Sequence, residues 1–141
     1  MTEAHPSAAA AHPDTMPPVI VLGRGITALG VIRSLARIGV VAYLVGADDG
    51  VVRHSRFYRA LPGSQDEPPS VGELEGFLLG LTAQAAVLFP CSDDWVAAIG
   101  EIPADLAKRF PSSLAPPAAL RTLIDKGTFA LALRHAVALV P

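Results

Sequence analysis

The spacing of hydrophobic residues changes several times along this chain. A continuous apolar run, Val19–Leu22, leads into Gly23-Arg24-Gly25, and apolar residues then recur every three or four positions over residues 26–38. A second apolar run covers residues 40–45. Short continuous apolar runs are typical of buried parallel strands, and the wider spacing is typical of a helix with one buried face. The beginning of the chain therefore predicts a β-α-β unit with a parallel crossover.

The same alternation continues over the rest of the chain. It predicts a strand near residues 58–61, a helix over 71–83, a strand over 86–89, and a helix that begins near Asp93. A short edge strand at 112–115 and helical stretches at 118–124 and 128–137 follow. Strands that alternate with helices favour a Rossmann-like, three-layer α/β/α fold around a mostly parallel sheet of about four or five strands.

Composition divides the chain into three parts. Residues 1–17 are rich in Ala, Pro and His and have no periodicity, which predicts a disordered N-terminal tail. Residues 18–117 carry the strand and helix pattern, so we expect one Rossmann-like domain there. Residues 118–141 are expected to form linking helices.

Length and charge exclude several classes of protein. With 141 residues, 51% of them apolar, the chain is long enough for one domain with a real core. Its net charge of −2 gives no electrostatic reason to expect a nucleic acid partner. The lone Cys91 excludes an internal disulfide and a cysteine-based zinc site. No secretory signal or membrane-spanning stretch is visible, so we expect a cytoplasmic protein without a membrane partner.

The turn after the first strand is the first candidate site. Gly23 and Gly25 allow a tight turn that exposes backbone N–H groups at the start of a helix, where the helix dipole favours anions. Arg24 lies in the same turn, and its guanidinium can form two parallel hydrogen bonds with a carboxylate or phosphate. The turn, with Ile26 and Thr27, is therefore a candidate anion site.

Two other interpretations of this turn stay open. Residues 23–28 also match the relaxed dinucleotide fingerprint G-x-G-x-x-A. That fingerprint needs an acidic residue at the end of the second strand, where this chain has Val45-Gly46, and Asp48 and Asp49 follow only in the next turn. Alternatively, the glycines serve only to let the helix and strand pack closely.

The segment that begins at Pro90 is the second candidate site. Ser92 can cap the helix that follows, and Asp93 and Asp94 complement its dipole. Because α/β sheets bind ligands at the carboxyl ends of their strands, Ser92 and Asp93 are also candidates for substrate contact. Cys91 is expected to be a small buried thiol and not a nucleophile. Residues 53–56 form either a second anion contact or a solvated loop.

Three segments, taken in order, resemble the N-terminal part of an ATP-grasp enzyme. The first is residues 18–30, which contain the glycine turn. The second is Ser55-Arg56-Phe57-Tyr58 together with residues 88–95, and the third is Asp125-Lys126, Phe129 and Val140-Pro141. Over residues 17–141 the chain is similar to the pre-ATP-grasp domain of carboxylate–amine ligases, such as D-aspartate ligase-like proteins and the large-chain group of carbamoyl-phosphate synthases.

The resemblance implies a reaction and a set of site residues. In this family ATP phosphorylates a carboxylate and an amine attacks the acyl phosphate, with ATP and magnesium as cofactors. The pre-ATP-grasp domain supplies part of the pocket for a small carboxylate or amino-acid substrate, and Lys126 matches a lysine that contacts ATP. By position, the substrate-binding residues are Gly23, Arg24, Gly25, Ile26, Thr27, Ser92 and Asp93.

The chain departs from this family at Pro141, where the nucleotide-binding half of such an enzyme begins. Because phosphoryl transfer depends on metal ions and positioned cations, we expect this chain alone to be catalytically inactive and to bind neither ATP nor magnesium tightly. A standalone nucleotide- or anion-binding module and a non-catalytic interaction protein are the alternatives. Exposure of Phe129, Leu131, Leu133 and Val137 would favour a homodimer or a frayed C-terminus.

Overall fold

The computed structural model of this chain describes residues 16–46, 50, 52–62, 70–82 and 85–138. The predicted N-terminal tail lies outside the described residues except for its last two positions. Asp48, Asp49 and the Val140-Pro141 pair also lie outside them.

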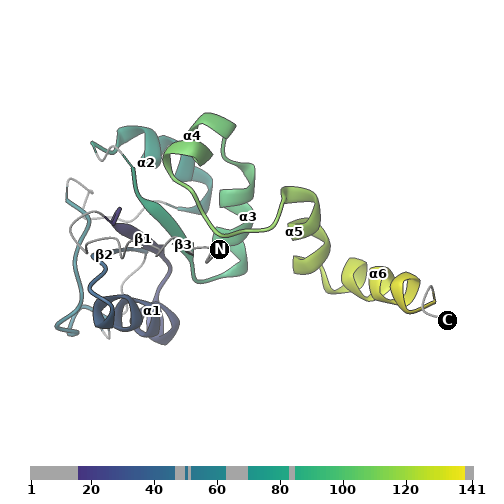
Figure 1. Ribbon diagram of the computed structural model, residues 1–141, viewed down its shortest axis with the longest axis horizontal. Coiled ribbons are helices and arrows are strands. Elements are labelled where there is room, and N and C mark those ends of the chain that lie inside the picture. Colours follow the sequence, from purple (N-terminus) through teal and green to yellow (C-terminus); the bar gives the residue numbers. More distant parts are fainter. Residues whose placement is uncertain (1–15, 47–49, 51, 63–69, 83–84, 139–141) are drawn as a thin grey trace, which may run out of the picture.

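The described residues form a three-layer α/β structure on a parallel sheet (Figure 1). Its strands are β1 (Val19–Leu22), β2 (Ala42–Val45) and β3 (Val87–Pro90), in the spatial order β2-β1-β3. Helix α1 (Gly25–Arg37) joins β1 to β2 and packs on one face of the sheet. The other face is covered by η2 (Val71–Glu73), α2 (Leu74–Gly80), α3 (Asp93–Glu101) and α4 (Ala104–Arg109).

Strand β1 is central because both of its faces are buried. Val19 and Val21 pack into the core beneath α1, and Ile20 and Leu22 pack into the core beneath the other helices. Since successive side chains of a strand point to opposite faces, every residue of this run enters one core or the other. The run therefore has no polar position, as the sequence predicted.

The larger core depends on a helix that the sequence pattern did not reveal. Helix α4 is short, and it places Leu106 and the fully buried Phe110 against the core. Arg109 links α4 to the end of α2, because its Nη2 donates a 2.7 Å hydrogen bond to the Leu81 carbonyl. Its guanidinium also lies 4.8 Å from the centre of the Phe110 ring.

The sheet has fewer strands than the sequence predicted. The expected strands near 58–61 and 112–115 are reduced to single parallel bridges, Leu44 with Ala60 and Leu88 with Ser112. Prolines adjoin both segments, at Pro62 and Pro111. Because proline has no N–H to donate, such segments pair poorly with a neighbouring strand and stay short at the sheet edge.

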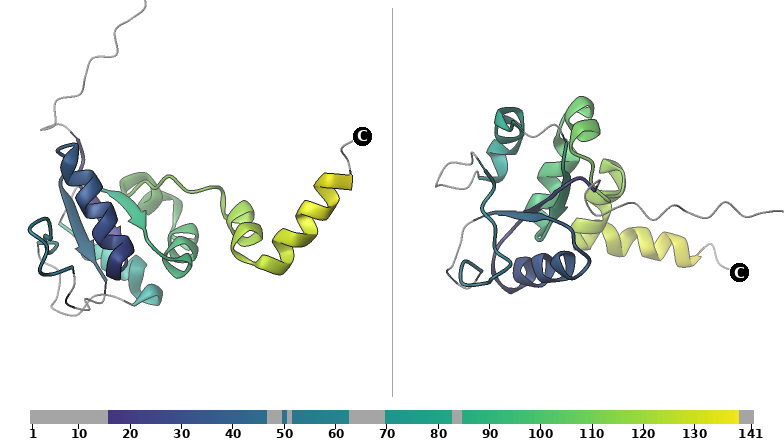
Figure 2. Two further views of the ribbon diagram at one scale, coloured as in Figure 1. Left: turned by 90° about the horizontal axis from the view of Figure 1, so that it is seen from below. Right: turned by 60° about the vertical axis from the view of Figure 1, so that its left-hand side comes forward.

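Helices α5 (Pro117–Ile124) and α6 (Lys126–Ala138) form an arm that leaves the three-layer body (Figures 1 and 2). Helix α5 packs against α3 through the buried Leu120, and α6 packs against α5. Residues 126–137 are all exposed. This confirms that the four large apolar side chains of α6 are exposed: Phe129, Leu131, Leu133 and Val137. Among the described residues, no helix has both the length and the apolar content that crossing a bilayer requires.

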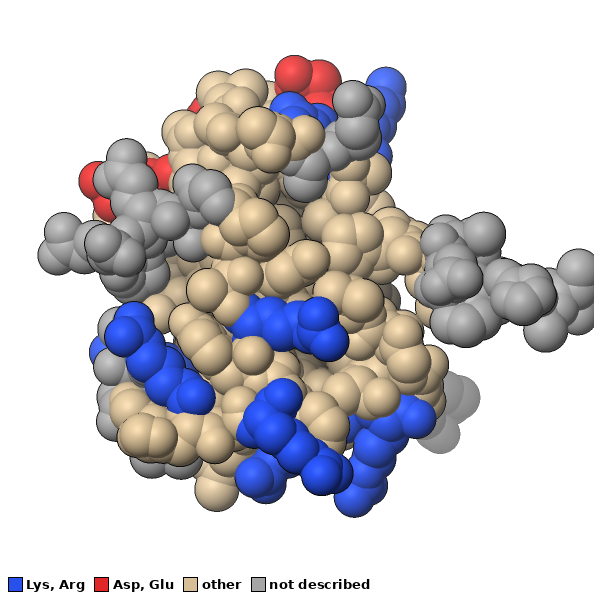
Figure 3. Space-filling view, turned by 90° about the vertical axis from the view of Figure 1, so that its left-hand side faces the viewer, with Lys and Arg blue, Asp and Glu red and all other residues tan. Residues whose placement is uncertain are grey.

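Charged residues are unevenly distributed along the chain and over its surface. Residues 16–62 contain six arginines and two aspartates, whereas residues 63–107 contain eight Asp and Glu and no Lys or Arg. Figure 3 shows Lys and Arg side chains gathered in its lower half, level with α1. Acidic side chains lie in its upper part, level with α2 and α4, with some basic side chains beside them. Basic side chains therefore predominate in the lower half of this view, and both signs of charge occur in the upper half.

Candidate functional site

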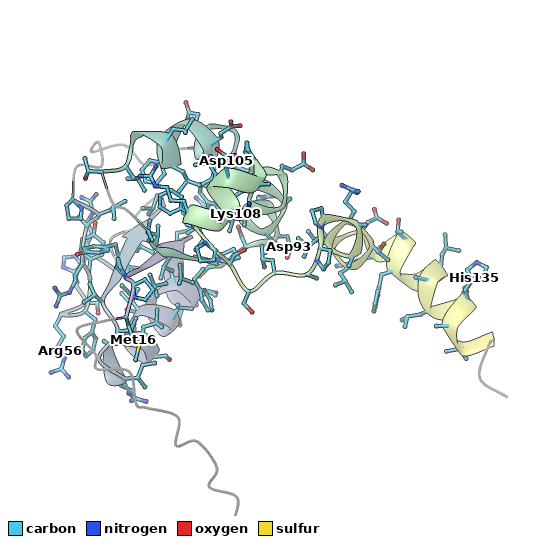
Figure 4. The ribbon with its side chains drawn as sticks, turned by 45° about the horizontal axis from the view of Figure 1, so that its top comes forward. Met16, Arg56, Asp93, Asp105, Lys108 and His135 are labelled. Atoms are coloured by element: carbon cyan, nitrogen blue, oxygen red, sulfur yellow. The ribbon has the colours of Figure 1, made fainter. Side chains whose placement is uncertain are left out.

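Three turns meet at the edge of the sheet where the strands end. The Gly23 N–H donates a 2.9 Å hydrogen bond to the Val45 carbonyl, and the Cys91 N–H donates a 2.8 Å bond to the Leu22 carbonyl. Figure 4 shows Met16, which precedes β1, and Asp93, which follows β3, at opposite ends of the sheet. We call the edge formed by residues 23–27, Gly46 and residues 91–93 the carboxyl edge.

The chain reverses its direction of winding at the carboxyl edge. It passes from β1 to β2 on one side, and β3 lies on the other side of β1. The space outside the carboxyl ends of β1 and β3 is thus a topological switch point, which is where open α/β sheets bind ligands. The structure brings both predicted segments together at this point: a Cβ on Gly23 would lie 2.5 Å from the Cβ of Cys91.

The glycines at this edge are required by backbone geometry. Gly25 has φ +65°, and Gly23 and Gly46 both have φ +153°. A Cβ on Gly46 would overlap the Gly23 carbonyl oxygen and lie 2.8 Å from its carbonyl carbon. Close packing therefore explains Gly23 and Gly46, so the case for an anion site depends on the neighbouring N–H groups and on Arg24.

The same contact bears on the dinucleotide interpretation. An acidic side chain at position 46, where that fingerprint places its ribose contact, would collide with the backbone of Gly23. Val45 is buried, so it does not offer this position to a ligand.

Helix α1 begins at the carboxyl edge without a side-chain cap. Arg24 occupies the N-cap position with extended backbone, φ −148° and ψ 176°, and its side chain makes no capping bond. The first N–H groups of a helix have no partner within the helix, and here Gly25, Ile26 and Thr27 supply them. No acidic residue lies in the first turn to balance the helix dipole. An anion above this turn would meet both needs.

The side chains around this turn are open to solvent. Arg24 and Thr27 are exposed, and Ile26 is 83% exposed, so Ile26 offers its backbone N–H to a polar ligand. Within the described part of the chain, neither the Arg24 guanidinium nor the Thr27 hydroxyl has a hydrogen-bond or ion-pair partner. Both groups are therefore free to contact a ligand without breaking an existing interaction.

Helix α3 begins at the same edge with the opposite electrostatic character. Ser92 occupies its N-cap position with extended backbone, but its hydroxyl makes no capping bond, which differs from the cap that the sequence predicted. Asp93 and Asp94 lie in the first turn, as expected. Their carboxylates already complement the dipole and would repel a bound anion. An anion would therefore be favoured at α1 and not at α3, where Asp93 would instead favour a cationic group.

Cys91 lies between the two candidate segments. Its side chain is half-buried, and burial raises the pKa of the thiol above its usual range. Because the nucleophile is the thiolate, a raised pKa keeps this group in its unreactive form near neutral pH. The prediction of a buried thiol is thus met only in part, because the side chain is half-buried.

Arg56, the last residue of the basic segment 53–56, does not lie with these groups. Figure 4 places Arg56 at the Met16 end of the sheet, away from Asp93, so Arg56 is not a second anion contact at the carboxyl edge. Ser55 holds the turn, since its Oγ accepts a 3.3 Å hydrogen bond from the Phe57 N–H. The Arg56 guanidinium lies 4.7 Å from the centre of the Phe57 ring. The segment thus acts locally, as an ordered surface turn.

The predicted nucleotide contact lies on the arm. Lys126 is the exposed first residue of α6, and Figure 1 shows α6 apart from the sheet. The preceding Asp125 caps α6, because its Oδ1 accepts a 2.6 Å hydrogen bond from the Thr128 N–H, which lowers the pKa of Asp125. This role of Asp125 was not predicted, although an aspartate directly before a helix is a common N-cap residue.

No metal-binding group can be assigned in the part of the chain that the structure describes. His, Cys, Asp and Glu side chains nowhere come together there in a group of three or more that could hold an ion. We therefore assign no metal ligand among these residues and derive no phosphoryl-transfer step for this chain.

In comparisons with known proteins, no family model matches this chain, and no curated protein or solved structure matches it either. Any functional assignment therefore depends on the geometry of the carboxyl edge.

Proposed function

We propose that this chain binds the carboxylate of a small substrate at its carboxyl edge, as the substrate-binding, Rossmann-like N-terminal domain of an ATP-grasp carboxylate–amine ligase. One observation carries the proposal. Helix α1 begins at a topological switch point with an uncapped first turn, and an exposed arginine occupies its N-cap position.

A carboxylate has two oxygens, and this turn offers donors for both. The N–H groups of residues 25–27 point out of the helix end, and the Arg24 guanidinium can add charge-assisted hydrogen bonds. Such bonds contribute about 1.5–3 kcal/mol each, more than neutral ones. The turn would hold the substrate carboxylate in a fixed orientation, which is what a reaction at that carboxylate needs.

Asp93 and Ser92 favour an amino acid as the substrate. They lie across the switch point from Arg24, on the turn that packs against Gly23. A carboxylate near α1 and an ammonium group near Asp93 would match the two electrostatic halves of the edge. In the proposed ligase, Lys126 would contact ATP, which would be the phosphoryl donor, and magnesium would neutralise the charge of its phosphates.

The second candidate is a standalone module for a phosphate-bearing ligand. The uncapped turn and Arg24 would also suit a phosphate group. A nicotinamide dinucleotide is disfavoured, because Gly46 leaves no room for the acidic ribose contact.

Nuclear magnetic resonance titration can separate these candidates. Labelled protein is titrated with D-aspartate, L-aspartate, succinate, inorganic phosphate and NAD, while the amide signals of Gly25, Ile26 and Thr27 are followed. We expect an amino-acid carboxylate to shift these signals at lower concentration than phosphate or NAD. A stronger response to phosphate or NAD would favour the second candidate.

Two matched variants test the role of Arg24. Arg24→Gln should weaken carboxylate binding about tenfold or more, because it removes a charge-assisted donor. Arg33→Gln changes another exposed arginine of α1, beyond its first turn, and should leave the affinity within about twofold. Equal effects of the two variants, or no response of the three amides to any carboxylate, would contradict the proposal.

A further inference from the structure

Helix α6 carries an apolar stripe that nothing in the described structure covers. Phe129, Leu133 and Val137 are four residues apart, so they lie along one side of the helix. Their exposed fractions are 38%, 47% and 70%. Lys126 and Arg134 flank this stripe, and both are exposed. The stripe therefore combines large apolar side chains with positive charge.

Helix α2, together with η2, has the opposite surface character. Gly72, Gly76 and Gly80 are also four residues apart and exposed, and a Cβ on any of them would meet nothing within 4 Å. Beside them, Leu79 is 58% exposed. Glu73 and Glu75 are exposed on the same segment, and residues 63–107 contain no Lys or Arg. The α2 surface is thus open and partly apolar, and the exposed charges of η2 and α2 themselves are negative, while Lys108 and Arg109 lie on the neighbouring α4.

We propose that α6 of one copy of this chain docks onto the α2 surface of a second copy. Large side chains on one helix facing glycines on another allow the two backbones to approach closely. The positive flanks of α6 would meet Glu73 and Glu75, so the two surfaces are complementary in charge as well as in shape. The arm directs α6 away from its own body, which makes a second molecule the natural partner (Figures 1 and 2).

Pairing of α6 with another α6 is less favourable. Both stripes would carry Lys126 and Arg134, so like charges would face each other across the contact. Reciprocal exchange, in which each α6 docks onto the α2 of the other copy, forms two contacts and closes a two-fold dimer. Doubling the contact matters, because specific interfaces usually bury about 1,200–2,000 Å² in total.

Sedimentation velocity over about 1 μM to 1 mM protein tests this inference. We expect a dimer that dissociates on dilution. Leu133→Glu on α6 and Leu79→Glu on α2 should each raise the dissociation constant about tenfold or more, because each buries an unpaired charge in the contact. Ile38→Glu is the matched control, since Ile38 is 67% exposed and belongs to neither surface. Circular dichroism checks that each variant keeps its helices.

A charge exchange identifies the partner surface. Arg134→Glu and Glu75→Lys should each weaken the dimer, and the double variant should recover at least part of the loss. Recovery would support contact between α6 and α2. A monomer throughout the concentration range would overturn the proposal, and so would a dimer that is insensitive to both α2 variants. None of these outcomes depends on ligand binding at the carboxyl edge.

Discussion

Substitution of Gly46 by alanine tests how closely the turns of the carboxyl edge are packed. The added Cβ would overlap the carbonyl oxygen of Gly23 and lie 2.8 Å from its carbonyl carbon. Both obstructing atoms belong to the backbone, so no side chain can rotate to make room. Either β1 and β2 separate at their carboxyl ends or the Gly23 turn moves.

The expected loss of stability has two parts. An alanine at φ +153° occupies a sparsely populated conformation, which costs about 1–3 kcal/mol. Forcing an extra methyl group into a packed region costs about 1–3 kcal/mol more. We therefore expect Gly46→Ala to lower the free energy of unfolding by about 2–6 kcal/mol, out of about 5–15 kcal/mol for a typical domain.

Gly50→Ala provides a matched control for the conformational part. Gly50 also has positive φ, +85°, but a Cβ there would meet nothing within 4 Å. Urea unfolding can be followed by the fluorescence of Trp95, the single tryptophan, which is buried in the larger core. Gly46→Ala should lose about 1–3 kcal/mol more than Gly50→Ala. Equal losses for the two variants would refute the close packing of Gly46 against Gly23.

Three further outcomes follow from particular residues. Gly30→Ala, in the exposed middle of α1, should raise the free energy of unfolding by about 0.5–1 kcal/mol in urea titrations, because the new methyl group meets nothing within 4 Å and alanine favours helix. Glu73 accepts hydrogen bonds from the Ser70 hydroxyl and N–H, at 2.7 and 2.8 Å, and these bonds lower the pKa of Glu73. Its contribution to folding stability is therefore fully present above the pKa of the carboxyl in the unfolded chain. That contribution is lost as the pH falls through the lowered pKa of the folded state. The difference in melting temperature between the wild type and Glu73→Ala should therefore shrink from about pH 6 to about pH 3. The thiol of Cys91, whose pKa is raised by burial, should react with iodoacetamide more slowly in the native protein at neutral pH than in urea, and equal rates would contradict its burial.

The sequence predicted the β-α-β unit well because several local signals agree there. The bounds of β1 coincide with the predicted run, since all four residues enter a core on one face or the other. Helix α1 begins and ends within one residue of its predicted range. Buried strands and long amphipathic helices are encoded by nearby residues, so they can be predicted without knowledge of the rest of the fold.

The edges of the sheet were harder to predict. Residues 58–61 and 112–115 are apolar enough to suggest strands, but each forms only one bridge. Whether such a segment pairs over several residues depends on its neighbours in space and on the prolines beside it. Ser70 and Glu73 form a capping box at the start of η2. This start could therefore have been predicted from the sequence, but it was not.

The candidate site, like the fold, could be predicted from the sequence only in part. Local sequence was enough to predict that the Gly23 turn and Ser92 each follow a strand. The parallel pairing of β1 with β3 then brings the two segments together. The contact between Gly46 and Gly23 joins two neighbouring strands, and no spacing in the sequence reveals it. The position of Arg56 depends on the path of the chain after β2, which turns back toward the other end of the sheet. Composition alone therefore overstated the number of cations near the site.

Arg24 is the residue for which fold stability gives no explanation. At an N-cap position, Ser, Thr, Asp or Asn would satisfy a free N–H group and stabilise the helix by about 0.5–2 kcal/mol. A cation there also opposes the helix dipole. The chain places acidic or capping groups at the start of η2, α3 and α6, through Glu73, Asp93 and Asp125. Local rules are broken at functional sites more often than elsewhere, so this uncompensated arginine supports the proposal that a ligand binds at the carboxyl edge.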